Sequence, residues 1–391
     1  MIAAFVSISL ALMLPARVAR RAASPILSAS SAWGGELSAE AAFAASVVQR
    51  AMQLCTALAC DMQTVDASRD GKTMDECDTT AGVSFIKEGD STPVTAADFA
   101  IQGLISAALR EAYPDDRFLG EEDATDLRSD PALLSLALDL CARHGGDADE
   151  AAFLAAVDRG VEKARGEDER VWVLDPIDGT KGFMTGKGYV VGLALLVSGE
   201  PVLGAMGVPS WEGDPPLMVA VKEHGLRWWP AAGDGPLDYE PPRPAWADAR
   251  YELPAPRGGA YPPWYVSPSS ARAVCQPFGP DAPPADLCCG SMVKYFAVAA
   301  DRAAGFIQYE EKCKTWDHAC GVICVEESGG RAQATDAYGA PVRFPGREFD
   351  VDGGIVCCSR SASLKMLNLL RAGVADDYQT EALLQMGDRP F

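Results

Sequence analysis

Histidine is scarce in this chain, and its cysteines lack the spacing that metal-binding ribbons use. Among 391 residues there are three histidines, at His144, His224 and His318, and they lie far apart. The sequence therefore argues against a histidine-rich zinc site and against a histidine-based catalytic triad. None of the twelve cysteines forms a C-x-x-C pair, so neither a zinc ribbon nor a thioredoxin-like motif is present.

Basic charge is also in short supply. The 34 Lys and Arg residues face 55 Asp and Glu residues, so the formal net charge at pH 7 is −21. Such a chain repels phosphate backbones and anionic lipid, and we expect neither a nucleic-acid polymer nor a membrane as its partner. With 48% hydrophobic residues it can still bury a packed core. We therefore expect any catalysis by this chain to use carboxylates.

Acid is missing from the first 35 residues, which differ from the rest of the chain. Their only charged side chains are Arg17, Arg20 and Arg21. The apolar run from Ile2 stops at Pro15, too short to span a bilayer, and a segment rich in Ser, Ala and Arg follows it. This pattern predicts a removable targeting segment for a plastid or a mitochondrion. The alternative is a leader that stays attached to a cytoplasmic protein.

Most of the cysteines are expected to be small, buried hydrophobic residues that remain thiols. Cys320 and Cys324 are four residues apart in a helix-like run and can face one another. A regulatory disulfide is the alternative, and the sequence does not select its pair.

Hydrophobic spacing predicts both helices and strands. Helices are expected over Leu37 to Met62, Ala96 to Ala112, Ala132 to Arg143, Glu150 to Arg165, Val293 to Ala303, His318 to Glu327 and Leu364 to Arg371. Strands are expected over Val171 to Leu174, Tyr189 to Val197, Val202 to Val208, Leu217 to Val221 and Gly225 to Trp229. Residues 131–170 look like a helical surface insertion, and the Pro-rich stretch from Gly233 to Pro263 predicts long loops. We place a domain boundary near residue 215, which divides the chain into a targeting segment (1–35), an N-terminal domain (36–215) and a C-terminal domain (216–391).

Four separated segments place acids beside Gly, Thr or Pro, where loops converge. They are Thr95-Ala96-Ala97-Asp98, Gly120-Glu121-Glu122-Asp123, Asp175-Pro176-Ile177-Asp178-Gly179-Thr180 and Trp316-Asp317. Mg²⁺ prefers oxygen ligands, and phosphate chemistry with two or more such ions needs carboxylates that bridge them. Asp175 and Asp178 follow a buried strand and can both point into one site, with the Ile177 carbonyl as a further ligand. Gly179 and Thr180 then open a turn whose N–H groups can hold a phosphate.

Each segment also has a simpler interpretation. Glu121 alone is typical of a solvated acidic loop, and Asp317 alone is typical of an Asp that caps a helix. Asp98 alone is typical of a dipole partner in a first helical turn. The segment from Asp175 to Thr180 is harder to explain as a mere turn, because two acids, a Pro and a Gly-Thr pair directly follow an apolar strand. The four segments together favour a metal centre.

In these segments the chain resembles the lithium-sensitive, magnesium-dependent sugar-phosphatase superfamily that includes inositol monophosphatase. The matching residues are Pro93-Val94-Thr95-Ala96-Ala97-Asp98, Gly120-Glu121-Glu122, Trp172-Val173-Leu174-Asp175-Pro176-Ile177-Asp178-Gly179-Thr180 and Trp316-Asp317-His318-Ala319-Cys320-Gly321. The continuation Lys181-Gly182-Phe183 resembles the 3′(2′),5′-bisphosphate nucleotidases within that superfamily. So do the residues from Glu122 to Arg128, Gln102, and the helical insertion before Asp175.

The resemblance implies an α/β fold, a layered αβαβα sandwich, and the hydrolysis of the 3′-phosphate of adenosine 3′,5′-bisphosphate to give AMP. It also implies action on 3′-phosphoadenylyl sulfate and a role in sulfur metabolism. By position, the residues that match the family's ligands for two or three Mg²⁺ ions are Glu121, Asp175, the Ile177 carbonyl, Asp178 and Asp317. Asp98 and Thr180 match the pair that orients and deprotonates the attacking water. The N-terminal domain would then carry most of the metal ligands.

The second half of the substrate is less well defined by the sequence. Gly290-Ser291-Met292-Val293-Lys294-Tyr295 resembles the family segment whose Ser and Lys hold the other phosphate, so Ser291 and Lys294 are candidates for the 5′-phosphate. The alternative for Lys294 is a buried or neutralised lysine. Two positions depart from the family pattern, because Ser270 stands where relatives carry a His and Gln308 where some carry a nucleotide-binding Arg.

Two other functions therefore stay open beside the nucleotidase, which we expect to act as a monomer on a small molecule. One is the same chemistry on an inositol phosphate or a sugar bisphosphate, favoured by the two departures. The other is a non-catalytic nucleotide sensor or scaffold, which the complete set of metal-site acids disfavours.

Overall fold

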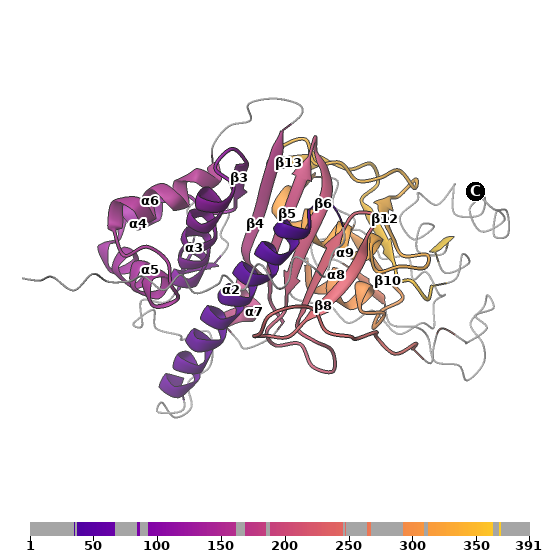
Figure 1. Cartoon of the computed structure of the whole chain (residues 1–391), viewed down its shortest axis with the longest axis horizontal. Helices are drawn as coiled ribbons and strands as arrows, with labels where there is room; N and C mark the ends of the chain where they lie inside the picture. Colours follow the sequence, from indigo (N-terminus) through magenta and orange to yellow (C-terminus); the bar gives the residue numbers. More distant parts are fainter. Residues whose placement is uncertain are drawn as a thin grey trace, which may run out of the picture.

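The computed structural model describes residues 35, 37–66, 84–86, 93–161, 169–184, 188–244, 247, 264–266, 292–308, 312–362 and 367–368. The helices and strands of these residues stack in layers (Figure 1). A six-stranded sheet has helices on both faces, and a four-stranded sheet lies beyond one of the two helical layers. The α/β class expected from the sequence is confirmed.

The six-stranded sheet carries most of the residues that the sequence assigned to a site. In spatial order its strands are β3 (Arg117–Gly120), β4 (Arg170–Asp178), β5 (Val190–Val197), β6 (Glu200–Gly207), β7 (Leu217–Val221) and β8 (Gly225–Trp229). β3 and β4 are parallel, and the other neighbouring pairs are antiparallel. Along β5, Leu193 and Leu195 belong to one hydrophobic cluster and Ala194 to another. Because side chains alternate along a strand, both faces of this sheet are buried.

The first face of the sheet is covered by α2 (Ser38–Asp66) and α3 (Ala96–Ala112). α3 begins where predicted because Thr95 and Asp98 form a capping box. Two short strands, β1 (Ser84–Ile86) and β2 (Pro93–Thr95), pair immediately before it. The predicted insertion forms α4 (Thr125–Ser129), α5 (Pro131–Arg143), α6 (Glu150–Asp158) and the 3₁₀ turn η3 (Arg159–Val161). α5 and α6 pack on α3, on the left in Figure 1.

The second face is covered by α8 (Met292–Ala299) and α9 (Thr315–Glu326), which separate the two larger sheets. The second sheet has the order β12 (Gln333–Asp336), β14 (Ile355–Cys358), β10 (Gly305–Gln308) and β9 (Trp264–Val266). A small pair, β11 (Lys312–Lys314) and β13 (Glu348–Asp350), lies at the start of α9. α9 approaches β6 closely at Gly204, where a Cβ atom would lie 2.5 Å from Cγ2 of Ile323. Glycine is therefore required at that position.

Several predicted boundaries are wrong. The helix expected to end at Ala303 ends at Ala299, because Asp301 adopts a φ of 61° and stops it. The helix expected to begin at His318 begins at Thr315, and the strand expected to end at Leu174 continues to Asp178. The second insertion helix ends at Asp158, and residues 162–168 lie outside the described part.

Other predictions fall partly outside the described residues. Only positions 367 and 368 of the last predicted helix are described, and both are helical. The predicted loop from Gly233 is irregular as far as residue 244, apart from a bridge between Trp228 and Leu237. The boundary at residue 215 falls between β6 and β7, which pair in one sheet, and the division into domains stays a prediction.

The seven cysteines whose side chains are described are free and buried, as expected of small hydrophobic thiols. They are Cys55, Cys141, Cys313, Cys320, Cys324, Cys357 and Cys358. Cys320 and Cys324 both face β6, with their sulfur atoms near the carbonyls of Ala205 and Gly204. Among the described helices, none is both long and apolar enough to cross a membrane.

Candidate metal centre

The end of β4 places two aspartates on the same side of the sheet. Asp175 is opposite Gly192 and Asp178 is opposite Val190, so β4 has one more residue than β5 in this interval. In a regular strand, two residues that are three positions apart face opposite sides of the sheet. The extra residue in β4 is a β-bulge, and it turns Asp175 and Asp178 to the same side. Asp175 shares the face of Val173, which packs in the cluster around α8 and α9. Both acids therefore lie on the face of the sheet that α9 covers.

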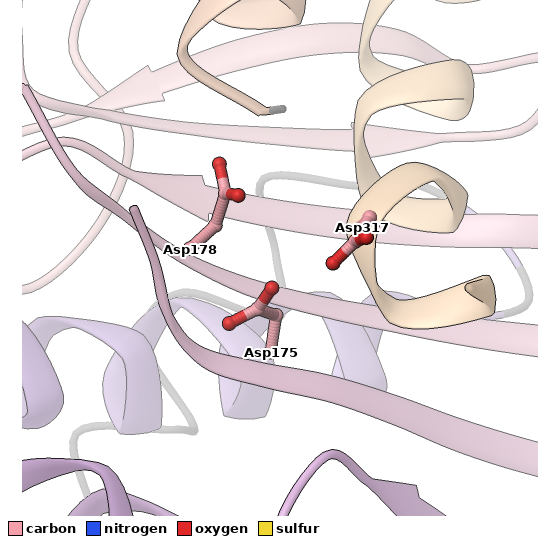
Figure 2. Close-up of side chains that lie close together, drawn as sticks. All are labelled: Asp175, Asp178 and Asp317. Atoms are coloured by element: carbon pink, nitrogen blue, oxygen red, sulfur yellow. The ribbon is translucent and has the colours of Figure 1, made fainter. Parts of the chain in front are cut away.

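Asp317 completes an acidic cluster from the other side. It lies in the first turn of α9, two residues after the helix begins at Thr315. One carboxylate oxygen from each of Asp175, Asp178 and Asp317 lies within 4.8 Å of the other two. Figure 2 shows the side chains of Asp175 and Asp178 on the strand and that of Asp317 on the helix converging on one space. The structure thus brings together three of the five predicted metal ligands.

The cluster is too acidic and too buried to be stable by itself as three carboxylates. Asp175 is 1% exposed, and among the described residues its Oδ1 atom has no hydrogen-bond partner. Burial, and then the charges of Glu121, Asp178, Asp317 and Asp98, raise the pKa of Asp175 well above its ordinary value. Burial, and then Asp178 and Glu121, likewise raise the pKa of Asp317. A bound cation would relieve this repulsion and give Asp175 Oδ1 a partner, and hard oxygen donors suit Mg²⁺.

Glu121 lies beside this cluster, on the turn that follows β3. Among the charged groups near Asp175, it has the largest effect on the pKa of that residue. The turn is held by Gln102, whose amide accepts a hydrogen bond from the Glu122 N–H (2.9 Å) and donates one to the Glu122 carbonyl (2.5 Å). Glu121 is half-buried and Glu122 is 2% exposed. These two residues are therefore not part of a solvated acidic loop.

Asp98 and Thr180, the predicted pair for activating water, each have a partner in the structure. The Asp98 carboxylate is 1% exposed and accepts hydrogen bonds from the Thr95 N–H (2.8 Å) and hydroxyl (2.7 Å). The Thr180 hydroxyl donates to the Ile177 carbonyl at 3.1 Å. Gly179, with a φ of 86°, lets the chain leave β4 and enter α7 (Thr180–Met184). The relay between Thr180 and Asp98 stays a prediction.

The residues predicted to contact the second half of a substrate lie only partly within the described residues. Ser291 lies outside the described residues, as does Ser270. Lys294 is 1% exposed, and its ammonium lies 5.0 Å from the centre of the Phe306 ring. This burial is what the alternative interpretation of Lys294 expects, and its contact with a phosphate stays a prediction. Gln308 is buried at the end of β10.

The sequence did not indicate Arg347, which contacts the turn that carries Glu121. Its guanidinium donates to the carbonyls of Gly120 (3.0 Å) and Gly160 (2.8 Å). A single arginine in an irregular segment has no local signal, and only the folded arrangement places it here.

His318, next to Asp317, takes no part in the cluster: it is buried, its Nδ1 lies 2.9 Å from the Tyr295 hydroxyl, and burial lowers its pKa to about 3.

Comparisons with known proteins identify the family of this chain. Residues 40–241 and 269–372 match the inositol monophosphatase family. A 3′(2′),5′-bisphosphate nucleotidase of Emericella nidulans is 32% identical over 73% of this chain and 90% of its own length. One from Oryza sativa is 29% identical over 91% of this chain and 100% of its own length. An Arabidopsis thaliana relative that is named as mitochondrial is 31% identical over 73% of this chain and 79% of its own length.

Solved structures with the same fold have lower identity. The Thermotoga maritima IMPase is 16% identical, covers 85% of this chain and 96% of its own, and has a TM-score of 0.50. The extragenic suppressor protein suhB from Bartonella henselae is 17% identical with the same coverage and a TM-score of 0.52. These two structures support the layered α/β sandwich that the sequence led us to expect.

Proposed function

This chain belongs to the inositol monophosphatase family, and we propose that it is a magnesium-dependent 3′(2′),5′-bisphosphate nucleotidase. Its reaction is the hydrolysis of the 3′-phosphate of adenosine 3′,5′-bisphosphate, which gives AMP and phosphate. The observation that carries the proposal is the cluster of Asp175, Asp178 and Asp317 in a chain whose relatives are named for this activity.

The residues that would hold Mg²⁺ are Asp175, Asp178, Asp317, Glu121 and the carbonyl of Ile177. Two or three bound ions would lower the pKa of a water molecule and neutralise charge that develops on the phosphoryl group. Asp175 is the central ligand, because it is the most buried of the three clustered acids and one of its oxygens has no other partner in the described part of the chain. The Asp178 carboxylate is held by the Met292 N–H at 2.6 Å, which fixes its orientation towards the cluster.

Proton transfer is assigned to Asp98 and Thr180. The Thr95 hydroxyl and N–H hold one oxygen of the Asp98 carboxylate, which keeps the side chain in one orientation. In this relay the Thr180 hydroxyl turns from the Ile177 carbonyl to donate its hydrogen to Asp98. It accepts a proton from the attacking water as it gives its own proton to the Asp98 carboxylate, which is the general base. Backbone N–H groups of Gly179 and Thr180 bind the phosphate that is removed. No covalent protein nucleophile is needed.

The nucleotide's second phosphate is assigned to Ser291 and Lys294. Hydrolysis of 3′-phosphoadenylyl sulfate by the same site would link the enzyme to sulfur metabolism. Ser270 and Gln308, which depart from the family pattern, keep an inositol phosphate or a sugar bisphosphate as the second candidate substrate.

We also propose that the enzyme is a monomer and that residues 1–35 direct it to an organelle. The acid-free, arginine-bearing composition of this segment supports import, and the Arabidopsis thaliana relative named as mitochondrial supports that organelle in particular. A plastid is the alternative destination.

The substrate is tested by phosphate release from the full-length protein. The assay compares adenosine 3′,5′-bisphosphate, inositol 1-phosphate, inositol 1,4-bisphosphate and fructose 1,6-bisphosphate, each with Mg²⁺ and with or without Li⁺. We expect the nucleotide to be hydrolysed fastest, with loss of activity in a chelator and inhibition by Li⁺. Asp98→Asn serves as the inactive control, because it keeps the hydrogen-bonding shape but not the basic carboxylate.

The outcomes separate the candidate functions. Turnover of an inositol phosphate but not of the nucleotide would support the second candidate and contradict the first. Turnover of none of the four substrates would favour a protein that binds nucleotides without catalysis.

A further inference from the structure

The residues before β13 reach back from late in the chain to the turn that carries Glu121. Arg347 is the last residue before β13 and lies 226 positions after Glu121. Its Nη1 atom donates to the carbonyls of Gly120 and Gly160, at 3.0 and 2.8 Å, and its Nη2 atom lies 3.4 Å from the Glu121 carbonyl. A guanidinium presents its donors in a rigid planar fork, so several acceptors together fix one orientation of the turn.

Arg347 also contacts the start of α9, which carries Asp317. The centre of its guanidinium lies 4.6 Å from the centre of the Trp316 ring. Its own carbonyl accepts a hydrogen bond from the Thr315 N–H at 2.8 Å, and the Thr315 hydroxyl donates to the neighbouring Gly346 carbonyl. The first turn of α9 is thus capped by the backbone of the same residue whose side chain holds the Glu121 turn.

The opposite side of the Glu121 turn is held independently. Gln102 bonds both backbone groups of Glu122, and a Cβ atom on Gly120 would lie 2.5 Å from the Gln102 Oε1 atom. Arg347 and Gln102 therefore hold the turn from two sides. Loss of the arginine side chain removes one of these two supports and leaves α3, β3 and the Gln102 contacts in place.

We propose that Arg347 is a positioning residue for the metal centre. It holds the Glu121 turn and the first turn of α9 at a fixed distance and orientation, so that Glu121 and Asp317 both face Asp175. This inference rests on the proposed function, because it takes Glu121 and Asp317 as metal ligands. In this role Arg347 acts through the backbone carbonyls that it holds and not on the substrate.

The test is the binding of Mg²⁺ alone to the full-length, chelator-treated protein, measured by isothermal titration calorimetry. Residues that orient metal ligands typically change metal affinity by about 10- to 100-fold when replaced. We expect Arg347→Gln to raise the dissociation constant for Mg²⁺ by about that factor, and Arg347→Lys to raise it less, because one ammonium can replace part of the fork. Arg343→Gln is the matched control, since Arg343 is four residues away, half exposed and paired with Glu200 at 3.0 Å.

A second measurement separates positioning from folding. The melting temperature of each variant in a chelator reports the structural cost of the substitution without any metal. An Arg347→Gln protein that binds Mg²⁺ as tightly as the parent overturns the inference, whatever its melting temperature. If Arg347→Gln does not fold, the Mg²⁺ dissociation constant of Arg347→Lys decides in its place: a value equal to that of the parent overturns the inference. A parent protein that binds no Mg²⁺ overturns the proposed function itself, so the two failures are distinguishable.

Discussion

Replacing Asp175 by Asn should stabilise the metal-free protein while it abolishes activity. In the parent, one oxygen from each of three carboxylates lies within 4.8 Å of the others. At an effective dielectric constant of about 20, each ionised pair at that distance repels by about 3 kcal/mol. Asp175→Asn removes two of the three pairs, and its amide can donate a hydrogen bond to a neighbouring acid.

The expected gain is smaller than the full repulsion, because the parent relieves part of it by keeping protons on the cluster. We expect a net stabilisation of about 1 to 3 kcal/mol, the usual range for an unsatisfied buried polar group. For a chain of this length that corresponds to a rise of roughly 1 to 4 °C in melting temperature. The assay is a thermal melt in a chelator, followed by the same melt in saturating Mg²⁺, where only the parent gains stability from binding.

The pH dependence provides an independent check. The folded protein raises the pKa of Asp175, so above the ordinary pKa the unfolded chain has lost a proton that the folded chain still holds. The contribution of Asp175 to the stability of the metal-free parent therefore falls as the pH rises from about 4, until the pH passes the raised pKa. Asp175→Asn should lose stability less steeply over the same interval. A variant that melts lower than the parent in chelator, with an unchanged pH slope, would refute this reasoning.

Three further predictions follow from other contacts. Asp178→Asn should lower phosphate release by orders of magnitude, while its melting temperature in a chelator stays within a few degrees of the parent's; near-parental rates at saturating Mg²⁺ would contradict its role as a ligand. Trp172→Phe removes the indole N–H that donates to Asp116 at 2.9 Å and should cost about 1 to 3 kcal/mol in urea unfolding, whereas an unchanged midpoint would show that the bond contributes nothing. His318 has a pKa of about 3 in the folded protein against 6.5 ordinarily, so the unfolded chain alone gains its proton as the pH falls through this interval. Stability should drop by about 1.4 kcal/mol per pH unit from this group, and His318→Gln should show a shallower loss in melts from pH 7 to 4.

Local signals in the sequence predicted some elements to the residue. The strands Leu217–Val221 and Gly225–Trp229 have the predicted bounds, because two apolar runs flank a short polar turn that ends in a glycine with a φ of 80°. The helix Ala96–Ala112 has the bounds that its hydrophobic spacing predicts, and the capping box of Thr95 and Asp98 fixes its first residue.

Tertiary contacts determine the helix boundaries that helix propensity alone predicts wrongly. The alanines after Ala299 favour a longer helix, yet the buried Asp301 leaves helical geometry and accepts hydrogen bonds from Ser361 and Arg360. α9 begins early because Thr315 donates its N–H to Arg347, which is 32 positions later in the sequence. None of these three partners is visible in a local pattern.

The acids of the candidate site were predictable because they follow motifs, whereas the residues that hold them were not. Asp175, Asp178 and Asp317 stand in segments that the resemblance picks out, and the structure brings them together. Arg347 has no motif, and its importance depends on a fold that joins positions more than 200 residues apart. The β-bulge that turns Asp175 and Asp178 to one face is likewise visible only in the register with β5.

The separation of β4 from α9 along the chain determines when the acidic cluster can form during synthesis. Asp178 and Asp317 are 139 positions apart, so a growing polypeptide completes β4 long before the ribosome has made α9. Until then Asp175 and Asp178 have no third clustered acid, and the Glu121 turn lacks the guanidinium that arrives 30 positions after Asp317. The acidic cluster can therefore form only late, once the residues from Thr315 to Arg347 have been translated and have docked.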